Sequence, residues 1–552
     1  MSSLASRLAR PEIVSMPPVD VAAQANAAFS ADAIKLDANE NPFVPLVEGA
    51  LASNVNRYPE PQPAVLVRAL AALYGVAPEN LVATRGADDA IDILIRSFCR
   101  PGVDAISVCQ PTFSAYAQFA RLQGARIVEA RLDADYEFDA DAFLATAKAE
   151  ANLKLAFICS PNNPTGNPVP PQDVLRVADA LGETIVVLDE AYIEFSELES
   201  LAGEAVKREN LVILRTLSKA YGLAGARVGC AIGNAELIAL ASRALPPYPL
   251  PSLAIQAALA TLSPSRRPLH IARIGTLKAE RERLAGLLAG SPIVNKVRSG
   301  GANFLFVEVD DAPALAKKLH GLGIRVRFRP NAAPNGVRLS IGTEAENEAL
   351  LAAFGVVSDA PAHRRAESVR DTRETNIAVA VDLDRTEPRA IDTGIAFFDH
   401  MLDQVAAHGG FSLILKCEGD LEIDAHHSLE DCALAFGGAL SKALGDRRGI
   451  GRFGFSLPMD ETEAHVLIDL SGRAYAKFEG DFEASHIGAY PTEMTRHIFR
   501  SFADSLGAAI HVRVTGENDH HKTEACFKAF GRALRQAVRR EGDVLPSTKG
   551  VL

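Results

Sequence analysis

The chain has 552 residues, of which 48% are hydrophobic, and it carries a formal net charge of −12 at pH 7. This length exceeds what one hydrophobic core usually organises, and the acidic balance argues against nucleic acid as the main partner. The seven cysteines never form C-x-x-C, which favours buried free thiols over a disulfide framework or a zinc–thiolate site.

The N-terminal sequence MSSLASRLARPEIVSMPP has no continuous apolar core, so we expect no signal peptide. No stretch of the chain approaches the roughly 20 apolar residues that a membrane-spanning helix needs. We therefore expect a cytoplasmic protein without a membrane partner.

Short apolar strands alternate with amphipathic helical stretches between about residues 60 and 240. The clearest predicted strands are 154–160, 183–190, 210–216 and 226–233. This alternation predicts a parallel sheet that helices cover on both faces. Residues 268–289 follow as a predicted long helix, and 303–354 as a smaller α+β domain.

The segment after the strand 210–216 places Lys219 near two hydroxyls and an arginine. Thr216, Ser218 and Arg227 together suit a phosphate group, because they offer hydrogen bonds and a fixed positive charge. A lysine forms imines near neutral pH only in a sheltered place with cations nearby. Taken alone, Lys219 is better explained as a surface loop lysine.

Two further polar segments follow predicted parallel strands, at the sheet edge where ligands gather. Asp189 ends a buried strand, where a carboxylate is costly unless a cation such as a protonated pyridine nitrogen pairs with it. Asn163 and Tyr192 could hydrogen-bond a phenolate oxygen on the same ring. A plain turn remains an alternative explanation for SPNNPTG, the segment around Asn163.

Together these motifs resemble the fold-type I aminotransferases, and within them the histidinol-phosphate aminotransferase family, over about residues 10–355. The resemblance implies pyridoxal 5'-phosphate as the cofactor, a large domain with a parallel-type sheet and a small α+β domain. It implies that Lys219 bonds covalently to the cofactor and that Asp189 pairs with its pyridine nitrogen. The other implied cofactor contacts are Asn163, Tyr192, Thr216, Ser218, Arg227, Phe113, Gly86, Ala87 and Asp88.

The resemblance also implies residues at the substrate end. Asn39, Asn41 and Arg338 match positions that bind the substrate, and an arginine can hold a carboxylate or phosphate with two hydrogen bonds. Tyr58 matches a tyrosine that reaches the cofactor of the neighbouring subunit, which implies a dimer. The sequence departs from the family pattern at Ala87, where a small hydroxyl residue is commoner, and at Phe113, where Tyr is commoner.

A second domain follows. Residues 358–368 carry Pro, Ser and charge without apolar periodicity, so we place a linker there, between domains at 1–357 and 369–552. Segment 426–440 aligns without gaps to 520–534, and nine of the fifteen positions are identical, which indicates a duplicated half-domain. We expect each half to be strands followed by a helix, an α+β arrangement.

Both copies of the repeat carry H-H-x-x-E. On a helix His426 and Glu430 share one face and can converge on one ion, and so can His520 and Glu524. The second histidine of each adjacent pair is rotated by about 100° and cannot easily bind the same ion. The pattern therefore predicts two metals, bridged between elements or subunits. Mixed His and Glu ligands favour manganese, with iron or zinc as competitors.

These motifs resemble the imidazoleglycerol-phosphate dehydratase family over about residues 366–552, from RDTRETNI to LPSTKG. The resemblance implies manganese ligands at His400, His426, His427, Glu430, His497, His520, His521 and Glu524. Glu374 would be a catalytic acid or base, and Arg452, Arg473, Ser547 and Lys549 would bind the substrate phosphate. His408 is either a neighbour of the metal site or a core histidine.

One further motif points to another class of enzyme. The string Asp382-Leu-Asp384-Arg-Thr386 matches the D-x-D-x-T loop of haloacid-dehalogenase phosphatases. The dehydratase-like segment at 393–411 follows within ten positions, which leaves no room for a phosphatase domain. We therefore interpret the motif as a strand edge and turn.

The two resemblances agree, because the product of the dehydratase is the keto substrate of the aminotransferase. We expect a homo-oligomer that converts imidazoleglycerol phosphate to imidazole-acetol phosphate, then to L-histidinol phosphate, with L-glutamate as donor and 2-oxoglutarate as its product. One alternative is an aminotransferase for another aromatic or phosphorylated amino acid. Another is a scaffold with an inactive half, but Lys219, Asp189 and all eight candidate metal ligands are present, which argues against it.

Overall fold

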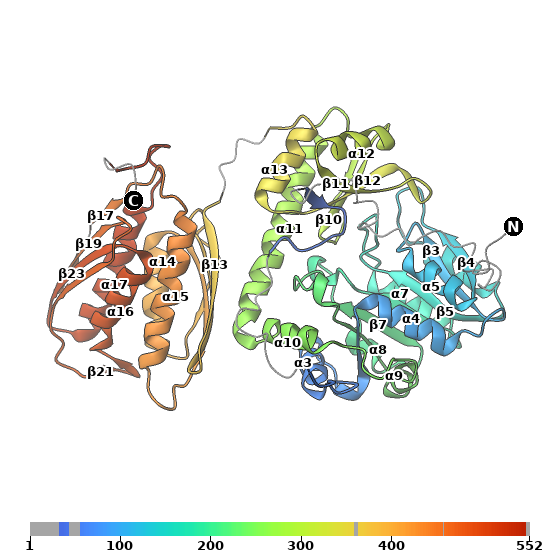
Figure 1. Cartoon of the computed structure of the whole chain (residues 1–552), viewed down its shortest axis with the longest axis horizontal. Coiled ribbons are helices and arrows are strands. Elements are labelled where there is room, and N and C mark those ends of the chain that lie inside the picture. Colours follow the sequence, from blue (N-terminus) through green and yellow to red (C-terminus); the bar gives the residue numbers. More distant parts are fainter. Residues whose placement is uncertain (1–32, 44–55, 358–362, 456–457, 548–552) are drawn as a thin grey trace. The chain divides into compact units, whose positions relative to one another are not determined.

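The computed structural model describes residues 33–43, 56–357, 363–455 and 458–547 (Figure 1). The chain forms two compact units. The first consists of Met1–Leu262 and Arg273–Asp359, and the second of Ser263–Ala272 and Ala360–Leu552.

The first unit contains a seven-stranded sheet with the order β2-β8-β7-β6-β5-β3-β4. Its strands are β2 (Leu81–Thr84), β3 (Ala105–Gln110), β4 (Arg126–Arg131), β5 (Leu153–Cys159), β6 (Ile185–Asp189), β7 (Leu211–Thr216) and β8 (Gly229–Gly233). From β4 to β7 all neighbours are parallel, so the predicted parallel sheet is confirmed for these strands.

The prediction was wrong for the last strand of this sheet, β8, which is antiparallel to both β7 and β2. The connection from Leu217 to Val228 carries only a 3-10 turn, Ala224–Ala226, and no crossover helix, so the chain returns in the opposite direction. The strand also begins later than residue 226, because Arg227 takes a left-handed conformation with φ 56°.

Helices cover both faces of this sheet, as predicted. One face packs on α3 (Ala64–Tyr74), α6 (Ala140–Lys148), α7 (Pro171–Ala180), α8 (Ala202–Ala205) and α10 (Ser252–Thr261). The other packs on α4 (Ala87–Phe98), α5 (Ala115–Gln123) and α9 (Ala235–Ser242). In β5, Ala156 and Ile158 face the first layer, whereas Leu155 and Phe157 face the second. Burial on both faces explains why the strand is continuously apolar.

A smaller sheet, of order β1-β11-β12-β10-β9, completes the first unit. Its strands are β1 (Ile34–Leu36), β9 (Lys296–Arg298), β10 (Phe304–Glu308), β11 (Ile324–Arg329) and β12 (Ala333–Ser340). It packs on α11 (Arg267–Ala289), α12 (Ala312–Gly321) and α13 (Glu344–Ala353), which confirms the predicted long helix and small α+β domain. The pairing of β1 with β11 brings residues 37–41 beside the small sheet.

The second unit has two main sheets. The first has the order β13-β14-β16-β15 and the second β17-β19-β23-β20, with β18 beside β19. Their strands are β13 (Arg365–Asp371), β14 (Thr375–Asp382), β15 (Arg389–Asp392), β16 (Ser412–Gly419), β17 (Phe453–Gly454), β18 (Pro458–Met459), β19 (Thr462–Asp469), β20 (Tyr475–Glu479) and β23 (Ala509–Thr515), and a small hairpin adds β21 (His486–Ile487) and β22 (Tyr490–Pro491). The D-x-D-x-T motif lies at the end of β14 and in the turn after it.

The boundary of the predicted linker needs correction. Its segment 358–368 includes the first four residues of β13, and residues 358–362 lie outside the described part of the chain. The side chains of β13 from Arg365 to Arg370 are all partly buried, without alternation between a buried and an exposed face. A strand of this kind lacks the apolar periodicity by which strands are recognised in a sequence.

The predicted duplication is visible in the topology of the second unit. In each half one strand is antiparallel and another parallel to the last strand: β14 and β15 flank β16, and β19 and β20 flank β23. Each half contains two helices, one more than predicted: α14 (Ala396–Gly409) and α15 (His426–Leu444), then α16 (Met494–Leu506) and α17 (Asp519–Ala537). Residues of these helices and of both sheets form one hydrophobic core.

Two equivalent glycines of the repeat lie where helices of the two halves meet. A Cβ on Gly437 of α15 would stand 2.0 Å from Oγ of Ser505 on α16. A Cβ on Gly531 of α17 would stand 2.6 Å from the carbonyl oxygen of Val405 on α14. At Gly531 the contact is with backbone, so glycine is required for α17 to pack on α14 this closely, whereas at Gly437 a Cβ would force the Ser505 side chain to move.

Two other expectations concern the whole chain. The seven cysteines are all buried and none forms a disulfide, as predicted. In the ranges that the structure describes, every helix is too short or too polar to cross a membrane.

Candidate active sites

The first unit contains a cavity of about 360 Å³ at the carboxyl ends of β5, β6 and β7, beside the small sheet. Most of the residues predicted to bind the cofactor or the substrate line this cavity. They are Asn39, Ala87, Asp88, Phe113, Asn163, Asp189, Tyr192, Thr216, Ser218, Lys219, Arg227 and Arg338. Parallel strands ending at one edge bring these residues together from distant parts of the sequence.

Lys219 lies in the loop after β7, and its Nζ donates a hydrogen bond of 2.8 Å to the carbonyl oxygen of Ala38. Burial lowers the pKa of Lys219 to about 8, and the positive charge of Arg338 acts in the same direction. A lysine with this pKa has an appreciable neutral fraction near pH 7.5, and only the neutral amine can attack a carbonyl. The surface-lysine alternative is wrong for this residue.

Asp189 is the last residue of β6 and is 3% exposed. Its Oδ2 accepts a hydrogen bond of 2.7 Å from the hydroxyl of Tyr116, and its Oδ1 accepts one of 3.1 Å from the backbone NH of Ala191. Burial raises the pKa of Asp189 to about 6. A buried carboxylate that forms no ion pair with any described residue fits a partner that brings positive charge into the cavity.

Asn163 and Tyr192 are hydrogen-bonded to each other and to residues at the substrate end. The amide of Asn163 donates to the Tyr192 hydroxyl at 3.3 Å, and Asn39 donates to the same hydroxyl at 3.1 Å. Nη1 of Arg338 donates to the side-chain oxygen of Asn163 at 2.6 Å. Nη2 donates to the backbone oxygen of Asp37 at 2.5 Å. The group predicted to hold the ring oxygen is thus directly connected to the predicted substrate arginine.

Hydroxyls and a guanidinium form the predicted phosphate site. Oγ1 of Thr216 donates to Oγ of Ser218 at 3.0 Å, and Arg227 lies 3.4 Å from that same Oγ. Gly86 precedes helix α4 with φ 79°, and a Cβ at this position would stand 2.8 Å from Nη2 of Arg227. The glycine therefore allows Arg227 to lie against the N-terminus of a helix, where an anion is stabilised.

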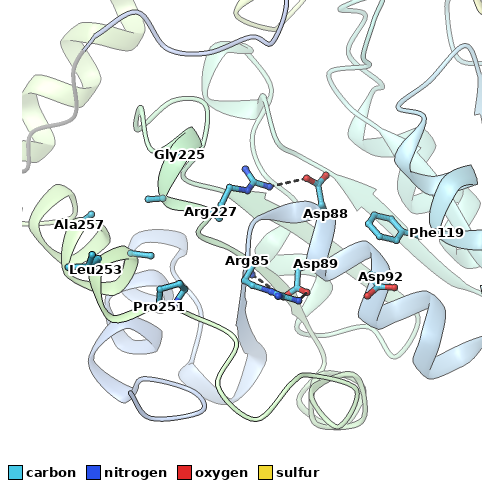
Figure 2. Close-up of a pocket in the computed structure, with 12 residues that line it drawn as sticks. Arg85, Asp88, Asp89, Asp92, Phe119, Gly225, Arg227, Pro251, Leu253 and Ala257 are labelled. Atoms are coloured by element: carbon cyan, nitrogen blue, oxygen red, sulfur yellow. Dashed lines mark hydrogen bonds and ion pairs between the residues drawn. The ribbon is translucent and has the colours of Figure 1, made fainter. Parts of the chain in front are cut away.

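A second groove of about 610 Å³ opens on the other side of Arg227. Figure 2 shows two ion pairs beside this groove, Arg227 with Asp88 and Arg85 with Asp89. Leu253 of α10 lines the opposite side of the groove. The ion pair of Arg227 and Asp88 measures 2.9 Å and lies on the border that this groove shares with the cavity.

Three of the predicted residues, Gly86, Asn41 and Tyr58, are not among those that line the cavity. The amide of Asn41 donates to the carbonyl oxygens of Lys219 and Ala220 at 3.1 Å each, so it supports the loop that carries the lysine. Tyr58 is 81% exposed and stacks on Tyr248, with ring centroids 4.4 Å apart. Within this chain, Tyr58 is not part of the site.

The cavity also contains residues that we did not predict from the sequence. Arg327 and Arg329 of β11 line it beside Arg338. The pattern IRVRFR places alternate arginines on one face of a strand, and this signal could have identified them. Burial lowers the pKa of Arg338 to about 10, and the positive charges of Arg327 and Arg329 act in the same direction. Tyr116, buried beneath Asp189, was also missed.

In the second unit the predicted metal ligands form two clusters that match the repeat. In the first, Glu430 of α15 lies 3.5 Å from Nε2 of His426 and 3.3 Å from Nε2 of His497 on α16. In the second, Glu524 of α17 lies 3.5 Å from Nε2 of both His520 and His400, the latter on α14. Each cluster therefore combines helices from both halves.

The distances in the first cluster suit a shared ion, because its three ligand atoms lie within 4.8 Å of one another. Divalent ions bind imidazole nitrogen and carboxylate oxygen at roughly 2.0 to 2.2 Å, so two ligands of one ion stand roughly 3 Å apart. Nε2 of His497 is buried and has no hydrogen-bond partner among the described residues. A buried nitrogen of this kind is costly unless a ligand or ion satisfies it.

The second histidine of each pair points elsewhere, as its helical position predicted. Nδ1 of His427 lies 3.1 Å from Oδ2 of Asp420, and its Nε2 lies 3.8 Å from Glu374. Nδ1 of His521 lies 3.0 Å from Oε2 of Glu461. Hydrogen bonds at Nδ1 leave Nε2 as the atom that can bind a metal.

Two of the predicted phosphate residues, Arg452 and Arg473, form their described hydrogen bonds outside these clusters. Arg452 forms two hydrogen bonds with the carboxylate of Asp469, at 2.7 and 3.1 Å, and one of 2.8 Å with the backbone oxygen of Pro546, beside Ser547. Arg473 is exposed and contacts only the backbone and side chain of Ser471 within the described ranges. Lys549 lies outside the described residues.

His408 is partly buried in the last turn of α14. Burial lowers the pKa of His408, and the positive charges of Arg532 and Lys528 act in the same direction. No described contact places its ring in either histidine–glutamate cluster, although the negative charge of Glu524 acts to raise its pKa.

Comparison with known families divides the chain in the same way. Residues 31–354 match the family described as aminotransferase class I and II, and residues 393–534 match imidazoleglycerol-phosphate dehydratase. The chain is 56% identical over 196 residues to the histidine biosynthesis bifunctional protein HisB of Stenotrophomonas maltophilia, covering 36% of this chain and 54% of that protein. It is 57% identical over 189 residues to HisB of Actinobacillus pleuropneumoniae, covering 34% and 52%. The chain thus spans about half the length of these relatives.

Solved structures resemble the first unit. Histidinol-phosphate aminotransferase from Sinorhizobium meliloti, in complex with pyridoxal 5'-phosphate, has a TM-score of 0.57 at 24% identity, covering 63% of this chain and 96% of that chain. Aspartate aminotransferase from Thermus thermophilus, with maleate, has a TM-score of 0.55 at 24% identity, covering 63% and 98%. At this identity the likeness concerns the fold, and it agrees with the fold expected from the sequence.

Proposed function

This chain belongs to the class I and II aminotransferase family and also carries an imidazoleglycerol-phosphate dehydratase domain, and from this premise we propose that it catalyses two consecutive steps of histidine synthesis. The second unit removes water from imidazoleglycerol phosphate to give imidazole-acetol phosphate. The first unit then transfers an amino group from L-glutamate to this ketone, which yields L-histidinol phosphate and 2-oxoglutarate. The observation that carries the proposal is the arginine-lined cavity around Lys219, which suits the phosphorylated ketone that the other unit would release.

The residues around Lys219 fit pyridoxal 5'-phosphate. When bound, this cofactor supplies an electron-withdrawing ring that stabilises negative charge on the carbon next to the transferred nitrogen. Lys219 would hold it covalently and move the proton at that carbon. Asp189 would pair with its ring nitrogen, and Phe113 would cover one ring face. Asn163 and Tyr192 would hydrogen-bond its ring oxygen.

The phosphate of the cofactor would bind between the hydroxyls and Arg227. Thr216 and Ser218 offer hydroxyl groups there, and helix α4 directs its first backbone NH groups, near Ala87 and Asp88, to the same place. The carboxylate of Asp88 now pairs with Arg227 and would share this arginine with the phosphate. The departure from the family pattern at Ala87 removes one hydroxyl contact and leaves the backbone contacts.

The arginines of the cavity support anionic substrates. Arg338 is nearly fully buried, and its guanidinium is already oriented by Asn163 and the Asp37 carbonyl. Arg327 and Arg329 line the same cavity. One group of arginines can then hold the carboxylate of glutamate, or the phosphate of the ketone, while the cofactor stays in place.

The donor set of the second unit fits two divalent ions per chain, and we propose manganese. Clusters of imidazole and carboxylate without thiolate suit manganese, iron or zinc. When bound, such ions stabilise negative charge on the imidazole ring of the substrate while a C–H bond breaks. Glu374, beside His427, would move the proton. Arg452, Arg473, Ser547 and Lys549 would bind the substrate phosphate.

We also propose that the enzyme is a cytoplasmic homo-oligomer. His427 and His521 point away from the ions that His426 and His520 would bind. If His427 and His521 also bind metal, other residues must complete the coordination of those ions. A second copy of the chain can supply those ligands. Tyr58 projects from the first unit and would reach the cofactor of a second copy.

Incubation of the pure protein with imidazoleglycerol phosphate, L-glutamate, pyridoxal 5'-phosphate and Mn²⁺ tests the proposed function. Mass spectrometry should find L-histidinol phosphate and 2-oxoglutarate. Accumulation of imidazole-acetol phosphate without its amine would contradict the assignment of the first unit, and would favour an aminotransferase for another aromatic or phosphorylated amino acid. Unchanged imidazoleglycerol phosphate would contradict the assignment of the second.

A further inference from the structure

Tyr116 is a buried residue of helix α5 that the sequence did not single out. It is 0% exposed, and its hydroxyl donates a hydrogen bond of 2.7 Å to Oδ2 of Asp189. It is not among the residues that line the cavity, whereas its contacts Phe113 and Asp189 are. We propose that Tyr116 is a positioning residue that holds the Asp189 carboxylate in the orientation needed to pair with the cofactor's ring nitrogen. The inference rests on the proposed function of the first unit.

The hydrogen bonds of Asp189 leave its carboxylate little freedom. Oδ2 accepts from Tyr116, and Oδ1 accepts from the backbone NH of Ala191 at 3.1 Å. Each oxygen therefore has one fixed donor on the protein side, and its remaining lone pairs are left for a ligand. The bond from Ala191 is local, two residues along the chain, whereas the bond from Tyr116 ties β6 to a separate helix.

Tyr116 can act as a rigid support because its own ring is fixed on two sides. It stacks on Phe157 of β5, with centroids 4.8 Å apart and an angle of 17° between the rings. It meets the edge of Phe113 at 5.7 Å and 85°. Phe113 is the residue expected to cover the cofactor ring. One side chain thus supports both the acid at the ring nitrogen and the aromatic group at the ring face.

Burial of a tyrosine hydroxyl is unfavourable unless the hydroxyl is hydrogen-bonded, whereas phenylalanine would fill the same apolar space without this cost. Burial raises the pKa of Tyr116 well above 10, so the hydroxyl keeps its proton and acts as a donor to Asp189. Burial raises the pKa of Asp189, and the hydrogen bond from Tyr116 is the largest influence in the opposite direction. The hydroxyl therefore favours the charged carboxylate, the form that pairs with a protonated ring nitrogen.

The test is Tyr116→Phe in the full-length protein, which removes the hydroxyl and keeps the ring. Titration of the cofactor-free protein with pyridoxal 5'-phosphate measures its affinity, and the absorbance of the lysine-bound cofactor gives a spectroscopic signature. We expect the dissociation constant to rise roughly tenfold or more, as for the loss of a hydrogen bond to a charged group. We also expect the pH midpoint of this absorbance to rise. The midpoint reports loss of the proton on the nitrogen that joins Lys219 to the cofactor, and a weaker positive charge on the ring nitrogen makes that proton harder to remove.

Tyr490→Phe is a matched control. Tyr490 is also 0% exposed, and its hydroxyl forms one buried hydrogen bond of 2.9 Å, with Thr495, but it belongs to the second unit. This variant should leave cofactor affinity and absorbance unchanged. If it altered them as Tyr116→Phe does, the effect would not come from the contact with Asp189, and the inference would be overturned.

A double-mutant cycle separates positioning from a general structural role. In a protein that already carries Asp189→Ala, Tyr116→Phe should weaken cofactor binding no further. Additive losses would overturn the inference, because they would mean that the hydroxyl acts independently of Asp189. If the unmodified protein formed no covalent adduct at Lys219 with the cofactor, the proposed function would fail instead. If the unmodified protein and Tyr116→Phe both formed the adduct, with equal cofactor affinity and equal pH midpoint, the role of Tyr116 would be rejected and the proposed function would stand.

Discussion

Arg338 donates a hydrogen bond of 2.6 Å to the side-chain oxygen of Asn163, although 175 residues separate them in the chain. Asn163 follows β5 of the large sheet, whereas Arg338 belongs to β12 of the small sheet. The bond therefore joins the residue expected to hold the cofactor ring oxygen to the residue expected to bind the substrate. Binding of an anionic substrate at Arg338 would therefore alter the hydrogen bonding of Asn163, the residue expected to contact the cofactor.

The first prediction concerns this arginine. Arg338→Lys keeps the positive charge but cannot form both bonds of the guanidinium, to Asn163 and to the Asp37 carbonyl. We expect the KM for L-glutamate and for imidazole-acetol phosphate to rise about tenfold or more, because hydrogen bonds to charged groups contribute about 1.5–3 kcal/mol each. Steady-state kinetics measures the change. Arg283→Lys, which alters an ion pair with Glu280 outside the cavity, should have little effect.

Lys219→Ala should abolish transamination and the absorbance of the lysine-bound cofactor. The dehydration of imidazoleglycerol phosphate should continue at its usual rate, because the two sites belong to different units. Assays of each reaction on the same preparation, with a cofactor absorbance spectrum, measure the outcome. If the variant kept the absorbance, another lysine would be the covalent site.

Removal of metal should have the opposite selectivity. A strong chelator should stop dehydration and leave transamination intact, and Mn²⁺ should restore the lost activity. Metal analysis of the active protein should find about two ions per chain, as expected for two-metal catalysis. Full dehydratase activity with a single ion per chain would contradict the assignment of both histidine–glutamate clusters as metal sites.

The repeated glycines offer a test of how the clusters are built. Gly531→Ala would place a methyl group against the backbone of Val405, and overpacking of this kind costs about 1–3 kcal/mol. The helices α14 and α17 should separate slightly, which weakens metal binding at His400, His520 and Glu524. Denaturant unfolding and metal titration measure both effects. Gly438→Ala, on a helix and with no atom within 4 Å of the new Cβ, is the control and should not destabilise the protein.

We expect that fusion of the two units does not by itself channel the intermediate. Tethering raises the effective concentration of groups that stay attached, whereas imidazole-acetol phosphate is released into solution. A coupled assay started with imidazoleglycerol phosphate should show similar lag times for the fused protein and for separate units at equal site concentrations. If the fused protein showed no lag, and resisted a competing aminotransferase in solution, a sheltered route between the sites would have to exist.

The sequence by itself determined the chemistry of both units, because each motif depends on spacing along one element. His426 and Glu430 share a helix face wherever the helix lies in the fold, and Lys219 follows β7 close to the hydroxyls that we predict to bind a phosphate. Only the tertiary structure decided which helices combine their ligands, so that His497 of α16 joins Glu430 and His400 of α14 joins Glu524. It also decided that β8 runs antiparallel, that Arg327 and Arg329 enter the cavity and that Tyr116 supports Asp189. These features depend on side-chain packing between elements distant in the chain, and helix or strand periodicity carries no information about which distant element packs against which.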